Sequence, residues 1–199
     1  MTDATNSPHA TDAPDAIDAA VKVGGALLCD PDALARTLTA LELLAGSRSI
    51  LVIPGGGPFA DAVRTADAQH SLADDTAHWM AILAMDQHAI LLASKMQRSE
   101  LVHRRGEIAR ALARRRIPVL APFRWLREAD PLPHSWDVTS DSIAAWVATE
   151  VGARQLILIK PDAHDALTAL DGYFDRARAP RLKYSILTPA MLTGNWFPA

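Results

Sequence analysis

Cysteine is almost absent from this chain of 199 residues, which contains only Cys29. A single cysteine excludes an intrachain disulfide framework and a cysteine-rich metal cluster, and it is typical of a protein in a reducing cytoplasm. Long apolar runs are missing too, since no stretch approaches the roughly 18 uninterrupted apolar residues of a membrane-spanning helix. We therefore expect a cytoplasmic protein that has no membrane as a partner.

Excess charge is small as well. The formal net charge is −3 and the isoelectric point is near 6.1, which gives no general electrostatic reason to bind nucleic acid. The segment from Arg104 to Arg116 is basic, but aromatic residues on which bases stack are absent from it. A solvated helix over Glu107–Ala113 explains these arginines better, and nucleic acid is not expected as a partner.

The first 18 residues differ in composition from the rest of the chain. They are rich in Ala, Asp and Thr, lack Lys and Arg, and have no apolar core, so they are not a secretory signal. The rest is long enough for one domain with a sizeable core. We expect a disordered tail over residues 1–18 and a single domain over residues 19–199.

Apolar runs alternate with helical periodicity after this tail, which is typical of βα units around a mainly parallel sheet. The expected strands are Ala19–Val23, Ile50–Ile53, Pro118–Ala121, Gln155–Lys160 and Leu182–Leu187. The expected helices are Pro31–Leu44 behind an Asp30 cap, Pro58–Ala68, Leu72–Lys95 capped near Ser71, Glu107–Ala113, Thr139–Val151 capped at Thr139 or Ser140, and Ala166–Ala177. The Pro-rich stretch 122–133 is expected to be a loop, long enough to cover a site.

Two glycine-rich turns each follow an apolar run and precede a helical stretch: Lys22-Val23-Gly24-Gly25 and Pro54-Gly55-Gly56-Gly57-Pro58. Glycine lets backbone N–H groups approach an oxyanion closely, and the following helix directs its positive dipole end to the same place. Lys22 adds a cation that neutralises phosphoryl oxygens. Either turn alone is also compatible with a tight connection that binds nothing, but together they predict two anion cradles.

A third motif, Trp136 to Ser142, places the Asp141 carboxylate and the Thr139 and Ser140 hydroxyls at the start of a helix. By itself it is compatible with an ordinary N-terminal cap. Beside two anion cradles it also suits phosphoryl transfer, which asks a protein mainly for positioning and charge stabilisation.

These three motifs resemble those of the amino acid kinase superfamily over roughly residues 19 to 165. The first turn is similar to the family's Lys-x-Gly-Gly, which holds the transferring phosphoryl group, and the second to the loop that grips the acceptor. Thr139-Ser140-Asp141 is similar to the family's Asn-Ala-Asp, whose aspartate orients the catalytic lysines. The resemblance implies an α/β three-layer sandwich around a mainly parallel sheet, with a shortened C-terminal part, and ATP with Mg²⁺ as cofactors.

The resemblance and the residue types together give an expected set of site residues. The catalytic residues are Lys22, Asp141 and Lys160, the last preferred to Arg176 or Lys183 as a second lysine because it ends a strand beside the expected phosphates. The expected nucleotide- or phosphate-binding residues are Gly24, Gly25, Ser140 and Asp162. The expected acceptor-binding residues are Gly55, Gly56, Gly57, Arg64 and His78, with a surface helix arginine and a satisfied or exposed histidine as the alternatives for the last two. No dedicated metal site is expected, since Mg²⁺ usually binds through substrate phosphates.

Within the superfamily, residues 55–64, 77–87 and 136–141 most resemble a short branch. Its archaeal members phosphorylate a furan-methyl phosphate in methanofuran biosynthesis, and its bacterial relatives belong to one-carbon metabolism. The resemblance implies a kinase whose acceptor is a small phosphate monoester and whose product is a diphosphate.

Two other functions stay open. The turn at residues 160–165 lacks the glycine of the family's Thr-Asp-Val-Asp-Gly-Val, and no Gly-Gly-Met-x-x-Lys follows it. These departures fit a non-catalytic nucleotide- or oxyanion-binding or storage protein of the same fold. An NAD-binding domain is disfavoured because neither turn has Gly-x-Gly-x-x-Gly. The apolar stretch Leu72–Lys95 predicts a homo-oligomer, with core packing as the alternative.

Overall fold

The computed structural model describes residues 17–161, 170–194, 196 and 197 of the chain. The expected tail apart from Ile17 and Asp18, the expected phosphate-binding Asp162 and the first part of the expected helix Ala166–Ala177 lie outside these residues. Ile17 is buried, and Asp18 accepts a hydrogen bond of 2.9 Å from the backbone N–H of Ser49.

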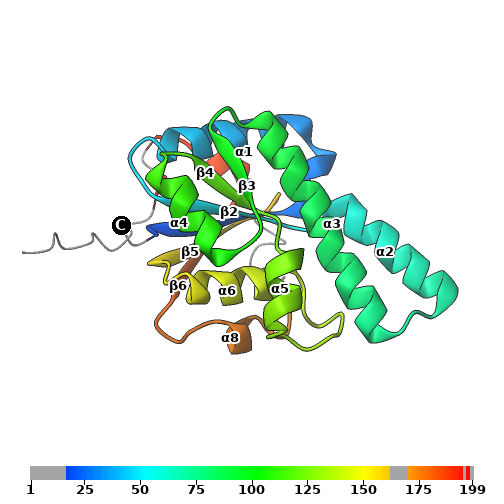
Figure 1. The fold of residues 1–199 in the computed structure, drawn as a ribbon. Coiled ribbons are helices and arrows are strands. Elements are labelled where there is room, and N and C mark those ends of the chain that lie inside the picture. Colours follow the sequence, from blue (N-terminus) through cyan, green and yellow to red (C-terminus); the bar gives the residue numbers. More distant parts are fainter. Residues whose placement is uncertain (1–16, 162–169, 195, 198–199) are drawn as a thin grey trace, which may run out of the picture.

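The centre of the molecule is a six-stranded sheet in the order β3-β4-β2-β1-β5-β6, and every strand pair in it is parallel (Figure 1). The strands are β1 (Ala19–Val23), β2 (Ile50–Pro54), β3 (Ser99–Val102), β4 (Ile117–Leu120), β5 (Gln155–Ile159) and β6 (Lys183–Leu187). The predicted α/β class and parallel sheet are confirmed. The four central strands are apolar and almost entirely buried, as a sheet covered on both faces requires.

Helices connect and cover these strands. They are α1 (Pro31–Leu44), α2 (Gly57–His70), α3 (Asp74–Lys95), α4 (Arg105–Ala113), α5 (Phe123–Ala129), α6 (Ser140–Glu150) and α8 (Phe174–Ala177), with 3₁₀ helices η1 (Gly25–Cys29) and η2 (Pro189–Met191). The predicted caps of α1 and α6 are confirmed: the Asp30 carboxylate accepts from the N–H of Ala33 at 2.9 Å, and Thr139 caps α6.

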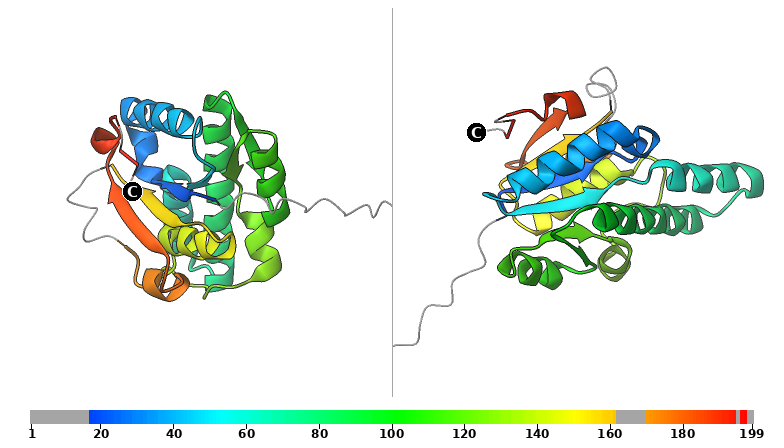
Figure 2. Two further views of the ribbon diagram at one scale, coloured as in Figure 1. Left: turned by 90° about the vertical axis from the view of Figure 1, so that its left-hand side faces the viewer. Right: turned by 90° about the horizontal axis from the view of Figure 1, so that it is seen from above.

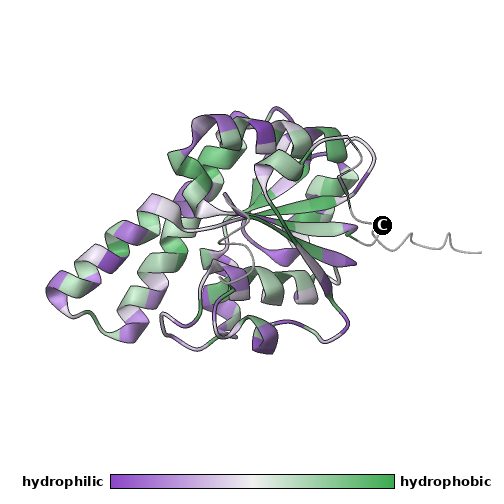
Figure 3. Cartoon of the chain, turned by 180° about the vertical axis from the view of Figure 1, so that it is seen from behind, coloured by the Kyte–Doolittle hydropathy of each residue, from purple (hydrophilic) through white to green (hydrophobic). Residues whose placement is uncertain are grey.

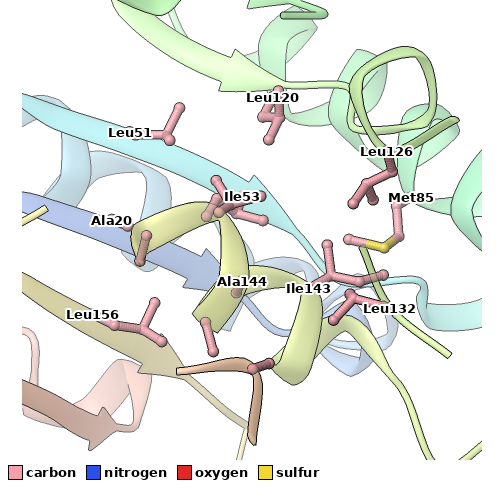
Figure 4. Close-up of a cluster of buried hydrophobic side chains, with 14 of the residues drawn as sticks. Ala20, Leu51, Ile53, Met85, Leu120, Leu126, Leu132, Ile143, Ala144 and Leu156 are labelled. Carbon is pink, nitrogen blue, oxygen red and sulfur yellow. The ribbon is translucent and has the colours of Figure 1, made fainter. Parts of the chain in front are cut away.

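The two faces of the sheet bury separate apolar clusters, which makes the predicted three layers. On one face α1 and the second half of α3 cover Val21, Val23 and their neighbours. On the other face α6, α4 and α8 cover Ala20, Leu156 and their neighbours, and Figure 4 shows Ala144 of α6 among them. Because side chains alternate along a strand, Lys22 and Lys160 share the α6 face with Ala20 and Leu156.

One helical hairpin extends beyond the sheet. In Figure 1 and in the right-hand view of Figure 2, α2 and the first half of α3 project past the carboxyl ends of the strands. The central strands are largely hydrophobic, whereas this projecting pair is banded by hydrophilic and hydrophobic residues (Figure 3). The hairpin therefore forms one wall of the space above the carboxyl ends of the sheet.

Four local expectations are wrong. Ser71 does not cap α3, because it ends α2 in the left-handed conformation with φ 49° and α3 begins at Asp74. The Pro-rich stretch contains α5, and β3 lies just before the basic segment, where no strand was expected. The described part of the helix Ala166–Ala177 is helical only at α8, a single turn.

Among the described residues, none of the helices combines the length and apolar character needed to cross a lipid bilayer.

Candidate active site

Asp141 lies between two buried lysines at the carboxyl end of the sheet. Its Oδ1 is 2.8 Å from Lys22 Nζ, and its Oδ2 accepts a hydrogen bond of 2.8 Å from Lys160 Nζ. The exposed fractions of the three residues are 4% to 7%. The three residues expected to be catalytic, which are separated by up to 138 positions in the sequence (160 − 22), are thus in direct contact.

The register of the central strands explains this convergence. β1 pairs with β5 so that Lys22 lies opposite Leu158, and the N–H of Gly24 donates to the carbonyl of Ile159 at 2.8 Å. This bond brings Lys160 alongside the first glycine turn. A Cβ on residue 24 would lie 2.6 Å from the Ile159 carbonyl oxygen, so only glycine fits there.

The ammonium groups keep Asp141 ionised. Burial would raise the pKa of the carboxyl, but Lys22 and Lys160 outweigh that effect and lower the pKa below its usual value. The carboxylate in turn holds both ammonium groups in place at the carboxyl end of the sheet. Lysines held in this way are preorganised to contact phosphoryl oxygens without further rearrangement.

The two glycine turns pack directly against each other. A Cβ on Gly25 would lie 2.1 Å from the backbone nitrogen of Gly57, and one on Gly57 would lie 2.5 Å from the Gly25 carbonyl oxygen. Gly57 also has a φ of +56°, which favours glycine. The Gly55 N–H donates to the carbonyl of Val23 at 2.8 Å. The two expected cradles therefore form one continuous backbone surface.

His88 of α3 holds the second glycine turn through a hydrogen bond, a role that the sequence did not reveal. Its ring is fully buried, and Nδ1 lies 2.7 Å from the Gly55 carbonyl oxygen. Because a carbonyl only accepts, Nδ1 carries the hydrogen. Burial lowers the pKa of His88, and the nearby Lys22 ammonium acts in the same direction, so the ring is neutral.

A cavity of about 310 Å³ opens beside the turns, between α6 and the projecting hairpin. It is lined by six of the expected site residues: Gly25, Gly56, Gly57, Arg64, His78 and Ser140. Other parts of its wall are apolar and come from Ile82, Met85 and Ile143. The expected residues Lys22, Gly24, Gly55, Asp141 and Lys160 do not line the cavity, but Gly24 and Asp141 directly adjoin residues that do.

Arg64 is fixed at the rim of this cavity. Its Nη1 lies 3.0 Å from the Asp61 carboxylate, and its guanidinium carbon lies 4.7 Å from the centre of the Trp136 ring. The indole N–H of Trp136 donates to Asp67 of α2 at 2.7 Å. The motif preceding α6 and helix α2 are therefore joined through these side chains, and the Arg64 guanidinium borders the cavity.

His78 lines the same cavity and stacks on His134 from the α5–α6 connection, with ring centres 4.2 Å apart. The His134 nitrogens lie 2.9 Å from Asp75 and 2.8 Å from Asp130. Burial, followed by the neighbouring His134, lowers the pKa of His78 to about 4, against the opposing influence of the two carboxylates. His78 is therefore neutral near pH 7.

Asp171 anchors the start of α6, although no local pattern marks it in the sequence. Its Oδ2 accepts hydrogen bonds from the Thr139 N–H at 2.9 Å, the Thr139 hydroxyl at 2.6 Å and the Ser142 N–H at 3.0 Å. The Ser142 hydroxyl donates to the other oxygen. These bonds hold the first turn of α6, and with it the Asp141 side chain, against the segment that follows β5.

Of the three basic residues considered as the second lysine, Lys160 is the one at the site. Lys183 begins β6 and pairs in register with Gln155, so it lies at the amino end of the parallel sheet. Arg176 belongs to α8 and lies over Tyr173, with 5.9 Å from its guanidinium carbon to the ring centre. Within residues 17–161 and 170–197, excluding 195, no group of three or more His, Cys, Asp or Glu side chains is arranged to hold a metal ion.

Comparison with known proteins agrees with this geometry. Residues 19–164 match the amino acid kinase family. The [5-(aminomethyl)furan-3-yl]methyl phosphate kinase of Methanocaldococcus jannaschii is 30% identical over 158 residues, which are 78% of this chain and 68% of that protein.

Two solved structures share the fold. The UMP kinase of Ureaplasma parvum superposes with a TM-score of 0.66 at 14% identity, covering 85% of this chain and 88% of that one. The uridylate kinase of Archaeoglobus fulgidus superposes with a TM-score of 0.56 at 17% identity, covering 73% of this chain. The chain spans 64% of the length of the latter enzyme. At identities this low, the similarity shows the fold alone.

Proposed function

The chain belongs to the amino acid kinase family, and we propose that it is an ATP-dependent phosphotransferase that acts on a small phosphate monoester. The observation that carries this proposal is the Lys22–Asp141–Lys160 contact, with both distances at 2.8 Å, beside the paired glycine turns. A carboxylate that fixes two ammonium groups next to a backbone cradle suits a polyphosphate and a transferring phosphoryl group.

The chain's own residues have distinct proposed tasks. ATP supplies the phosphoryl group when bound, and Lys22 and Lys160 neutralise its oxygens as charge moves from donor to acceptor. The Gly24 N–H is engaged by Ile159, so we assign the amide contact in this turn to Gly25. Asp141 positions the lysines, and because both its oxygens contact ammonium groups, Mg²⁺ fits this site through the nucleotide phosphates rather than through a dedicated set of ligands.

The cavity suits an acceptor with an anionic end and a flat apolar body. Arg64 at its mouth offers a planar fork for a phosphate, and Ile82, Met85 and Ile143 offer apolar contact. Because the Methanocaldococcus relative acts on an aminomethylfuran-methyl phosphate, we propose an acceptor of that kind, with a diphosphate as product, in the synthesis of a methanofuran-like one-carbon carrier.

Three further expectations enter the proposal. We propose that residues 19–199 form one domain and that the protein works in the cytoplasm. We also propose a homo-oligomer that forms through α3. Met80, Leu83 and Ile90 of this helix are exposed, and their spacing of three and seven positions places them on one face, which suits a second copy of the chain.

The deciding experiment incubates the purified protein with MgATP and a panel of phosphate monoesters that includes the aminomethylfuran-methyl phosphate. We expect ADP release that depends on the acceptor, and its loss in Lys22→Met. Arg110→Gln, a change to an exposed arginine on α4, is the matched control and should keep full turnover. Calorimetric binding of nucleotide without turnover on any acceptor would instead favour the non-catalytic binding or storage protein.

A further inference from the structure

A second polar groove lies at the opposite end of the sheet from the glycine turns. It has a volume of about 500 Å³ and is bordered by residues that precede β1, β2, β4 and β5, and by Arg98 before β3. Its charged lining residues are Arg48, Arg98, Arg115, Arg116, Arg154 and Asp18. The chain as a whole has a net charge of −3, so this concentration of positive charge is local.

The parallel sheet explains why the arginines meet. Amino ends of parallel strands lie at one edge, so side chains from well-separated connections gather there. Arg98 Nη2 donates to the Glu42 carbonyl at 3.0 Å, and Arg116 Nη2 donates to the Ser99 carbonyl at 2.7 Å. Backbone carbonyls thus hold two of the guanidinium groups in place, and each guanidinium has further N–H donors besides the one engaged.

The carboxylate in the groove compensates little of this charge. Asp18 lies 3.0 Å from Arg154 and also accepts from the Ser49 N–H, so it is committed to one arginine. Four other guanidinium groups border the same space, and all five arginines are exposed. An anion that bound among them would relieve their mutual repulsion.

Arg115 is placed where the backbone favours glycine. The end of α4 is a Schellman motif: the Arg116 N–H bonds the Ala111 carbonyl at 2.9 Å, and the Arg115 N–H bonds Leu112 at 2.8 Å. Arg115 consequently has a φ of +55°. A residue with a Cβ is strained in this conformation, whereas glycine is not.

Helix α6 ends with the same motif and has glycine at the equivalent position. There the Ala153 N–H bonds Ala148 at 2.9 Å, the Gly152 N–H bonds Thr149 at 3.1 Å, and Gly152 has a φ of +66°. Glycine at this position of α6 is the residue that the backbone geometry favours. At the end of α4 an arginine stands there instead, and its side chain lines the groove.

We propose that this groove is a binding site for a small anion that carries two or more phosphate groups. The planar guanidinium fork matches phosphate oxygens, and several converging forks favour a multiply charged ligand over a single phosphate. The described residues that line the groove include no aromatic side chain on which a base would stack, so the phosphates themselves are recognised. The proposal does not depend on the proposed kinase function, because the groove shares no lining residue with the cavity at the carboxyl end.

The test is a calorimetric titration of the full chain with inorganic triphosphate at low ionic strength. Arg115→Gly is the informative variant, because it removes one guanidinium while relieving the left-handed backbone, so its melting temperature should be equal or higher. We expect it to weaken triphosphate binding at the groove about tenfold, and Arg48→Gln to do the same. Arg110→Gln, on the same helix but outside the groove, should bind like the unchanged protein.

The double variant Arg48→Gln with Arg115→Gly decides the outcome. Loss of one class of triphosphate sites, with any class of sites that Lys22→Met abolishes left unchanged, supports the groove. Triphosphate binding equal to that of Arg110→Gln overturns it, as does a single class of sites that Lys22→Met abolishes. Neither of these two results bears on turnover, so the groove and the kinase proposal fail separately.

Discussion

The two ends of the parallel sheet are both rich in cationic side chains, yet they are built in different ways. At the carboxyl end Lys22 and Lys160 are buried and are fixed by one carboxylate, Asp141. At the amino end exposed arginines surround Asp18, which contacts one of them. The comparison teaches that burial, rather than the amount of charge, decides how strongly each end depends on single residues.

Removing the carboxylate at the buried end should give the largest effect. Asp141→Asn leaves two buried ammonium groups without a countercharge, so we expect turnover to fall about 10³-fold and the free energy of unfolding to fall by about 3 kcal/mol. Initial rates with MgATP and urea unfolding monitored by tryptophan fluorescence measure the two quantities.

Asp18→Asn is the matched change at the exposed end. We expect it to lower the free energy of unfolding by less than about 1 kcal/mol and to leave turnover unchanged. Equal losses of stability in the two variants would contradict the difference between the two ends of the sheet.

The backbone contact between the glycine turns gives the next largest effect. Gly25→Ala places a Cβ 2.1 Å from the Gly57 nitrogen, a distance that only a backbone shift relieves. We expect a loss of about 3 kcal/mol in the free energy of unfolding. We also expect the folded variant to have a raised KM for the acceptor. Chemical unfolding and steady-state kinetics measure these.

Gly106→Ala is the control for this prediction, because a Cβ on Gly106 meets no atom within 4 Å. Gly106 is the second residue of α4, and helices favour alanine over glycine, so this variant should be as stable as the unchanged protein or up to about 1 kcal/mol more stable. A similar destabilisation by both changes would show that the contact between the turns is not what requires glycine at position 25.

Most of the fold follows from local sequence patterns. The strands at 19–23, 50–54 and 155–159 are short apolar runs buried on both faces, and the caps at Asp30 and Thr139 are short-range signals that act within one turn. β3 was missed because three of its four residues are only half-buried, which gives no strong apolar pattern. α5 was missed because prolines flank it, although neither breaks it from inside.

The residues of the site likewise divide into those that a local motif marks and those whose partners are distant in the sequence. Lys22 and Asp141 were found because each stands in a motif beside a turn, and the register of β1 with β5 then brings Lys160 to them. His88 and Asp171 were missed because their partners, Gly55 and Thr139, lie 33 and 32 positions away. Such contacts depend on the packing of whole helices, so no local sequence pattern predicts them.

Protonation should distinguish the two ends of the sheet as well. The pKa of His78 is lowered from 6.5 to about 4 in the folded protein, so between these values the unfolded chain binds more protons than the folded chain. Stability should therefore be complete above about pH 6.5 and should fall as the pH drops towards 4, by up to about 3 kcal/mol for this group. The described residues that line the groove at the amino end include no histidine.

Urea unfolding at a series of pH values measures this effect, with His78→Phe as the comparison. The phenylalanine ring keeps an aromatic partner for His134 but carries no proton, so its stability should depend less steeply on pH between 4 and 6.5. Parallel pH profiles for the two proteins would show that another group is responsible for the loss.

The smallest effect belongs to the ion pair of Asp18 with Arg154, whose side chains are 16% and 67% exposed. A double-mutant cycle with Asp18→Asn and Arg154→Gln should give a coupling energy of about 0.2 to 1 kcal/mol that disappears at high salt, because exposed pairs are screened. A coupling above about 2 kcal/mol that survives high salt would mean that water is excluded from the amino end. The arginines there would then depend on fixed partners as the buried lysines do, and a phosphate ligand would have to displace Asp18 in order to bind.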